Sequence, residues 1–151
     1  MKYLVTGGAG FIGSHIVDRL IKDKNQVLVY DDFSTGRELF IKHHFQNSNF
    51  KLVKANLSDL KLLTKSMKGI DFVFHMAAHA DVRSGYDDHF IDHHENLEMT
   101  QNVLEAMYKN NVKKIAFAST SSVYGDASVH PTPEDYPLSP TSLYGATKAA
   151  A

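Results

Sequence analysis

Residues 6–15 of the chain read TGGAGFIGSH, and four of these ten residues are glycine. The stretch follows a short apolar run, KYLV at residues 2–5, and precedes a segment, 11–23, whose apolar residues recur at helical spacing. Glycine weakens a strand or a helix unless the backbone must turn tightly or another group must come very close. The sequence therefore predicts a strand, a tight turn and a helix, with a reason for leaving side chains out of the turn.

A phosphate group would supply that reason. The first turn of a helix has free N–H groups and partial positive charge, so it attracts anions, and glycine lets them approach. Gly8, Gly10 and Gly13 fit the dinucleotide-binding spacing G-x-G-x-x-G, and Gly7, Gly10 and Gly13 fit G-x-x-G-x-x-G. Spacing alone is a weak signal, and a flexible turn is the plain alternative. The flanking strand and helix favour dinucleotide binding, because the motif requires that context.

An acid follows at the distance that this motif requires. A second apolar run, QVLVY at residues 26–30, ends in Asp31 and Asp32, and Asp31 lies eighteen residues after Gly13. An acid at this point hydrogen-bonds the hydroxyls of the adenosine ribose and repels a 2′-phosphate. We therefore expect NAD rather than NADP. Arg37 is the counter-argument, although an arginine six residues further on is more often a solvent-facing loop charge.

Composition excludes several other classes of protein. The chain has 151 residues, of which 43% are hydrophobic, a net charge of −1 and no cysteine. This length and apolar content suit one globular domain, and the near-zero charge argues against binding nucleic acid. No apolar run reaches the roughly eighteen residues of a membrane span. We expect no membrane association and, since the first residues lack a signal-peptide pattern, a cytoplasmic protein.

The remaining segments alternate between strand-like and helix-like patterns. This alternation predicts right-handed crossovers and a parallel, doubly wound α/β sheet of the Rossmann type. A helix capped by Ser58 is expected before Gly69, and a longer helix with Leu104 among its inner residues is expected at 88–110. Further strands are expected at 51–57, 71–78 and 113–120.

The end of the sequence carries a second group of polar residues. Residues 118–125, ASTSSVYG, follow the fifth predicted strand, at the sheet edge where doubly wound folds bind ligands. All four prolines lie in the predicted loop 130–140. Tyr144 and Lys148 then stand four residues apart, on one face of a predicted helix. A Tyr-x-x-x-Lys pair alone usually marks a solvated surface, but here it can converge with the hydroxyl cluster and the glycine turn on one cleft.

Taken together, these stretches resemble the N-terminal half of an extended short-chain dehydrogenase/reductase, in the NAD-dependent nucleotide-sugar epimerase/dehydratase family. UDP-glucose 4-epimerases are the most similar branch. The matching stretches are VTGGAGFIGSH, YDDFSTG, HMAAHADVR, ASTSSVYGD and PTPEDYPLSPTSLYGATK, in the family's order. The resemblance implies that residues 1–151 are a partial NAD-binding domain, truncated before the later strands and the C-terminal substrate region. The 151-residue chain alone is then expected to be inactive.

The resemblance assigns roles residue by residue. It makes Thr120, Tyr144 and Lys148 catalytic. Asn56 departs from the aspartate usual in the family, but its amide oxygen can still accept a hydrogen bond from adenine. The cofactor is expected to contact Gly7, Gly10, Phe11, Ile12, Gly13, Asp31, Asp32, Ser34, Thr35, Gly36, Asn56, Leu57, Met76, Ala77, Ala78, His79, Asn96, Tyr144 and Lys148.

The activity that the resemblance implies is 4-epimerisation of a nucleotide sugar, most simply a UDP-sugar, by a homodimer with tightly bound NAD. The sugar carbinol would be oxidised to a 4-keto sugar and reduced again on its other face. Lys148 and the nicotinamide charge would favour the phenolate form of Tyr144, which takes the hydroxyl proton, while Thr120 orients the same oxygen. A 4,6-dehydratase is the first alternative, although Ser121 and Ser122 replace its usual Asp-Glu pair. A non-catalytic NAD-binding regulator is the second.

Nine histidines raise the question of a metal. His89 and His93 are four residues apart, but no third ligand is evident and the family needs none, so no metal site is expected. The pair His43-His44 lies in a polar segment and is expected at the surface. Arg83 is suited to a phosphate, and a salt bridge with a nearby aspartate is an equally good expectation.

Overall fold

A computed structural model describes residues 1–79, 81–83, 85 and 87–151. It contains two compact units. The first unit comprises Met1–Ala77 and Asn102–Phe117, and the second comprises Ala78–Gln101 and Ala118–Ala151. The glycine turn and Asp31 belong to the first unit, whereas Thr120, Tyr144 and Lys148 belong to the second.

The first unit is built on a five-stranded parallel sheet with the order β3-β2-β1-β4-β5. Strand order reverses at β1, so the predicted doubly wound topology is confirmed. Apolar side chains fill both faces of the central strands, which is typical of a parallel sheet covered on both sides. The strands are β1 (Lys2–Thr6), β2 (Gln26–Asp31), β3 (Phe50–Lys54), β4 (Phe72–His75) and β5 (Ile115–Phe117).

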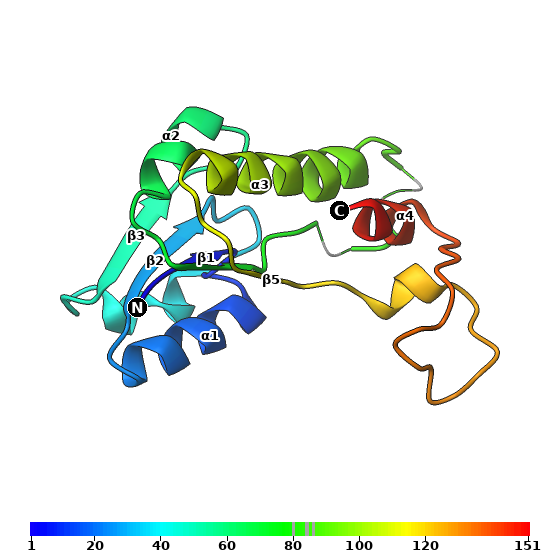
Figure 1. Ribbon diagram of the computed structural model, residues 1–151, viewed down its shortest axis with the longest axis horizontal. Helices are drawn as coiled ribbons and strands as arrows, with labels where there is room; N and C mark the ends of the chain where they lie inside the picture. Colours follow the sequence, from blue (N-terminus) through cyan, green and yellow to red (C-terminus); the bar gives the residue numbers. More distant parts are fainter. Residues whose placement is uncertain (80, 84, 86) are drawn as a thin grey trace. The chain divides into compact units, whose positions relative to one another are not determined.

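Helices cover the sheet of the first unit from both sides (Figure 1). Helix α1 (Phe11–Lys22) lies against one face, while α2 (Leu60–Ser66) and the part of α3 (Met99–Lys109) from Asn102 onward lie against the other. Two short 3₁₀ turns, η1 (Glu38–Phe40) and η2 (Lys42–His44), connect β2 to β3. The core between α1 and the sheet contains the fully buried side chains of Val5, Val17, Val29 and Ile41.

Several predicted boundaries in this unit were wrong. The third strand ends at Lys54 rather than 57, and the fifth is only Ile115–Phe117, because pairing with the neighbouring strand covers no more residues. Helix α2 is capped by Asp59, whose carboxylate accepts from Leu62 N at 2.9 Å. Ser58 lies one residue before the cap, in the preceding turn, where its N–H donates to Asn56 Oδ1 at 2.9 Å.

The helix expected at 88–110 begins later and is irregular. The Asp88 carboxylate accepts from Phe90 N at 2.9 Å in a turn, and the helical run starts only at residue 91. A π-helical segment, η4 (His93–Glu98), precedes α3. Leu104, expected inside, is 44% exposed, whereas Val103 is fully buried, because adjacent residues of a helix point about 100° apart.

The second unit has little regular structure. It contains η4 and the start of α3, the 3₁₀ turn η5 (Ser121–Tyr124) and helix α4 (Leu143–Ala150). The proline-rich segment 130–140 forms neither helix nor strand, as predicted. Among the described residues, no helix is both long and apolar enough to cross a membrane.

Candidate functional site

The turn between β1 and α1 is held by its glycines. Gly7 has φ +66°, and an added Cβ would lie 2.6 Å from Ala77 N. At Gly13, on the first turn of α1, a Cβ would overlap the Gly7 carbonyl oxygen. Both positions therefore need glycine for the backbone to pack against itself, with or without a ligand.

Gly10 is less constrained by the protein itself than Gly7 and Gly13 are. Its φ of −78° suits any residue, and a Cβ would have one near neighbour, Gly7 O at 3.2 Å. Gly10 caps α1 without any side-chain hydrogen bond, and the first turn contains no acid. Phe11 and Ile12 beside it are 71% and 60% exposed. The N–H groups at this helix end therefore have no side-chain acceptor and can bind an anion. The absence of a side chain at Gly10 would let a diphosphate approach them.

Asp31 ends β2 and is joined to the glycine turn. Its Oδ2 accepts from Ala9 N at 2.8 Å and its Oδ1 from Phe33 N at 2.9 Å. Burial raises the pKa of Asp31, and Asp32 raises it further, against the lowering effect of the two backbone hydrogen bonds. Arg37 is exposed, as expected, although its N–H donates to Ala9 O at 2.9 Å. Asp31 and the glycine turn are therefore joined in one hydrogen-bonded assembly.

Asn56, at the expected adenine position, forms a hydrogen bond that an aspartate could not. Its Nδ2 donates to Asp32 Oδ2 at 2.7 Å. Burial raises the pKa of Asp32, but hydrogen bonds from Ser34 and Asn56 outweigh that effect and hold it below the ordinary value. A second carboxylate at position 56 would repel Asp32 instead. Leu57 is buried, and Ser34 and Thr35 are exposed.

The end of β4 lies against the glycine turn through Thr6. Met76 N donates to Thr6 O at 3.1 Å, and Ala77 N donates to Thr6 Oγ1 at 3.3 Å. The Thr6 hydroxyl also lies 2.6 Å from His75 Nδ1, and both residues are fully buried. Sequence reasoning missed Thr6 and His75. The sequence did contain a signal, because each of these polar residues ends an apolar strand. The register of β1 and β4 places the two residues opposite each other.

In the second unit, His79 and Asn96 bind each other. His79 N donates to Asn96 Oδ1 at 2.9 Å, and Asn96 Nδ2 donates back to His79 O at 3.3 Å. Asp92, fully buried, lies 3.2 Å from His79 Nδ1 through its Oδ1. The sequence analysis did not identify Asp92. Asn96 thus positions the backbone of the segment at Ala78 and His79, which the resemblance places along the cofactor.

The three predicted catalytic residues are all in this second unit. Thr120 caps η5, with its hydroxyl 3.2 Å from both Ser122 N and Ser122 Oγ. Tyr144 and Lys148 lie on α4 and are buried. Helix α4 packs tightly on η5, since a Cβ at Gly145 would lie 2.6 Å from Ser122 O. Ser122 therefore links the threonine to the helix that carries the tyrosine and the lysine.

Lys148 is an unusual lysine. Its side chain is only 4% exposed, and burial lowers its pKa to about 8. Cationic side chains this deeply buried are rare outside functional sites. The shift therefore supports a chemical role for Lys148 rather than the solvated surface position that a Tyr-x-x-x-Lys pair usually has.

The predicted residues thus form two groups, one in each unit. The first unit joins the glycine turn, Asp31, Asn56 and Met76, and the second joins His79 with Asn96 and Thr120 with α4. Convergence of both groups on one cleft stays a prediction from the common strand edge.

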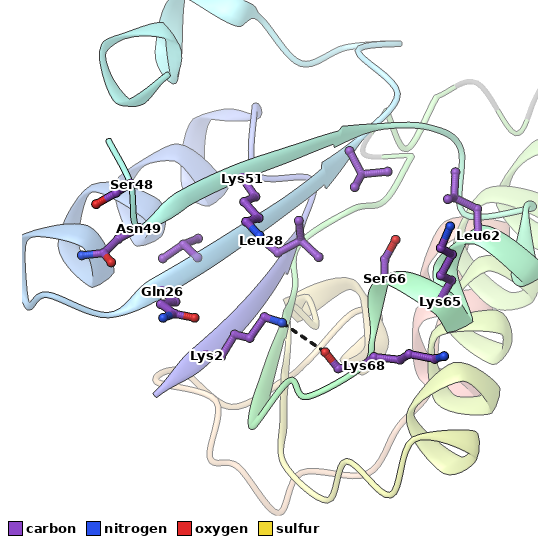
Figure 2. A pocket seen from close by; sticks show the side chains of 12 residues that line it. Lys2, Gln26, Leu28, Ser48, Asn49, Lys51, Leu62, Lys65, Ser66 and Lys68 are labelled. Atoms are coloured by element: carbon purple, nitrogen blue, oxygen red, sulfur yellow. Dashed lines mark hydrogen bonds between the residues drawn. The ribbon is translucent and has the colours of Figure 1, made fainter. Parts of the chain in front are cut away.

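The first unit also has a cavity at the opposite edge of its sheet, shown in Figure 2. It has a volume of about 460 Å³ and lies at the amino ends of β1, β2 and β3, beside α2. Lys2 there donates to Lys68 O at 3.1 Å. The cavity lies away from the glycine turn, so it takes no part in the candidate site. Its charged lining consists of Lys2, Lys51, Lys65 and Lys68.

Known proteins resemble this chain over nearly its whole length. Residues 3–151 match the NAD dependent epimerase/dehydratase family. A UDP-glucose 4-epimerase from Mycolicibacterium smegmatis is 41% identical over 154 residues, which cover 99% of this chain and 49% of that protein. The chain spans about half the length of the curated relatives it matches.

Solved structures agree with the sequence matches. The crystal structure of a UDP-galactose 4-epimerase is 45% identical with a TM-score of 0.88, covering 99% of this chain and 48% of that one. A double mutant of a dTDP-glucose 4,6-dehydratase from Streptomyces venezuelae, solved with NAD bound, is 31% identical with a TM-score of 0.93, covering 99% and 48%. The similar proteins therefore include both epimerases and dehydratases.

Proposed function

The chain belongs to the NAD-dependent epimerase/dehydratase family, and we propose from this that it is the cofactor-binding part of a nucleotide-sugar 4-epimerase. The observation that carries the proposal is the turn at Gly10, where a side chain is absent although an added Cβ would meet only one atom, Gly7 O at 3.2 Å. A UDP-sugar is the proposed substrate, because relatives similar to this chain are named for UDP-glucose and UDP-galactose. A cytoplasmic homodimer is the proposed state of the whole protein.

The residues of the first unit would bind NAD. The N–H groups at the start of α1 would hold the diphosphate at Gly10, with Phe11 and Ile12 beside it. Asp31 would accept from the adenosine ribose through lone pairs that its two backbone hydrogen bonds leave free. Its position also supports NAD over NADP, since a 2′-phosphate would meet a carboxylate. Asn56 would accept from the adenine amino group through Oδ1.

The residues of the second unit would transfer the hydroxyl proton of the sugar. Bound NAD supplies the electron sink for oxidising an unactivated sugar carbinol and the means of reducing it again. Tyr144 would accept the hydroxyl proton as phenolate and later return it. Lys148 would stabilise that phenolate, and its burial strengthens the effect because charges interact more strongly away from water. Thr120, held by Ser122, would orient the sugar oxygen.

Two residues favour epimerisation over the family's other reactions. Loss of water from the sugar requires a further acid and base near the catalytic threonine. Ser121 and Ser122 occupy those positions here, and neither hydroxyl is acidic enough for the task. A non-catalytic regulator is disfavoured because Thr120, Tyr144 and Lys148 are all present and Lys148 is buried at a cost.

A panel of UDP- and dTDP-sugars tests the proposal on the whole protein that contains this chain. We expect interconversion of a UDP-sugar and its 4-epimer without added NAD if the cofactor is tightly bound. A 4-keto-6-deoxy product would identify a dehydratase instead. NAD binding without turnover of any sugar would identify a regulator. The 151-residue chain serves as a parallel sample, in which we expect no turnover because the substrate region of the relatives has no counterpart in it.

A further inference from the structure

Two adjacent histidines converge on one carboxylate oxygen in the first unit, and none of the three residues belongs to the candidate site described above. His44 Nε2 lies 2.6 Å from Asp18 Oδ1, and His43 Nε2 lies 2.9 Å from the same oxygen. The two imidazole rings are 4.0 Å apart between centroids. Asp18 comes from α1 and the histidines from η2, so the arrangement depends on tertiary structure.

The sequence analysis placed both histidines at the surface, and that prediction is wrong for His44. Its side chain is only 12% exposed, with its ring 5.8 Å from that of Phe50. His43 and Asp18 are about half exposed. Burial by itself raises the pKa of Asp18, but hydrogen bonds with His44 and His43 outweigh that effect and lower it.

A second set, also of two adjacent histidines and a carboxylate, shows how the first set differs. In the second unit His93 and His94 approach Glu98, but they meet different oxygens, at 3.5 Å and 2.7 Å. All three of those side chains are about half exposed. Within the described part of the chain, only Asp18, His43 and His44 form a group of three whose ligand atoms all lie within 4.8 Å of one another.

We propose that Asp18, His43 and His44 bind a zinc ion, with water as the fourth ligand. Zn²⁺ lies about 2.0–2.2 Å from imidazole nitrogens and carboxylate oxygens in tetrahedral sites, so its ligand atoms stand roughly 3.3 Å apart. The present separations from Oδ1 would have to open by less than about 1 Å, which half-exposed side chains such as Asp18 and His43 can provide. Two imidazoles and one carboxylate without a thiolate suit Zn²⁺ among the available cations.

The ion would link α1 to the segment that follows Asp31. Asp18 lies on the helix whose first turn carries the phosphate site, and η2 lies between β2 and β3. His43 and His44 are 25 and 26 residues from Asp18 in sequence. A ligand that binds the folded chain and not the unfolded one stabilises the fold in proportion to its concentration. Zinc would thus regulate the stability of the cofactor unit.

Calorimetric titration of chelator-treated protein with ZnCl₂, in the absence of NAD and sugar, tests the site. We expect one Zn²⁺ per chain and a rise in the unfolding temperature on saturation. Asp18→Asn keeps the size of the side chain and should weaken binding at least about tenfold, as should His44→Gln. His44 is nearly buried, so replacing it also changes the packing of the fold. His43→Gln, at an exposed position, leaves the fold intact and should weaken zinc binding as well.

The double variant His93→Gln/His94→Gln is the matched control, since it removes two adjacent histidines beside a carboxylate elsewhere. It should retain the wild-type zinc affinity. Absence of binding in the wild type, or equal affinity in wild type and Asp18→Asn, would overturn the proposal. Loss of binding in the control alone would assign the ion to Glu98. The measurement uses neither cofactor nor turnover, so its failure leaves the proposed epimerase untouched.

Discussion

The glycine turn of the first unit and the Tyr144 region of the second use different parts of the chain for their chemistry. The turn presents backbone N–H groups, and its essential feature is a missing side chain at Gly10. The Tyr144 region presents side chains, Thr120, Tyr144 and Lys148, held by packing of α4 on η5. On the proposed function, cofactor binding would depend on backbone shape, whereas the reaction would depend on single side-chain atoms.

Replacing Tyr144 with phenylalanine should have the largest effect and should separate the two regions completely. In the whole protein, Tyr144→Phe removes one oxygen and keeps the packing of the ring on α4. Turnover of the accepted sugar nucleotide should fall by roughly 10²–10⁴-fold, the usual contribution of a general base. NADH binding, measured by fluorescence titration, should change little. Normal turnover would show that another group takes the proton.

The buried Lys148 should make the second region costly to fold. Its folded-state pKa of about 8 lies below the ordinary value of 10.5, so burial disfavours the charged form. Below about pH 8 both the folded and unfolded states are protonated, and the cost is present in full. Between pH 8 and 10.5 the folded state deprotonates first, and the cost is relieved as the pH rises.

Lys148→Met should therefore increase the free energy of unfolding at pH 7, by up to about 3 kcal/mol, while abolishing turnover. The gain should shrink between pH 8 and pH 10.5. Urea unfolding at both ends of this window measures it, with the exposed Lys61→Met as the control. A variant that is less stable than the wild type at pH 7 would mean that the contacts of the lysine outweigh the cost of burying its charge.

Replacing Asp31 should have the smallest effect, and this effect should be confined to cofactor binding by the first region. The carboxylate should make NADP bind at least about tenfold more weakly than NAD, or roughly 1.4 kcal/mol. Asp31→Asn keeps an oxygen for one backbone N–H and removes the charge, so this preference should narrow. Competition titration against NADH measures both values. Equal affinity for the two cofactors in the wild type would remove Asp31 from the ribose role.

The sequence predicted the first region well because its information is local. The run from β1 through the glycine turn to α1, and Asp31 at the end of β2, can be read from adjacent residues. Contacts between distant segments could not be read in this way. The pairing of Thr6 with His75 depends on strand register, and the meeting of Asp18 with His43 and His44 depends on how η2 packs beside α1.

Errors in the second region have the same origin. Nothing local in the sequence marks the π-helical segment before Met99, so a regular helix was expected there. The spacing of Tyr144 and Lys148 predicted a shared helix face correctly. The burial of Lys148 could not be predicted, because it depends on the packing around α4.

The central claim is that glycine at position 10 is required by the cofactor more than by the fold. NADH affinity and the unfolding temperature of Gly10→Ala, measured beside Gly13→Ala, test it most directly. We expect Gly10→Ala to fold with a modestly lower unfolding temperature, because its Cβ would lie 3.2 Å from Gly7 O and the turn must shift slightly, and to lose NADH affinity at least about tenfold. Gly13→Ala should fail to fold stably, because its Cβ would overlap the Gly7 carbonyl. A well-folded Gly10→Ala variant that binds NADH as tightly as the wild type would contradict the account.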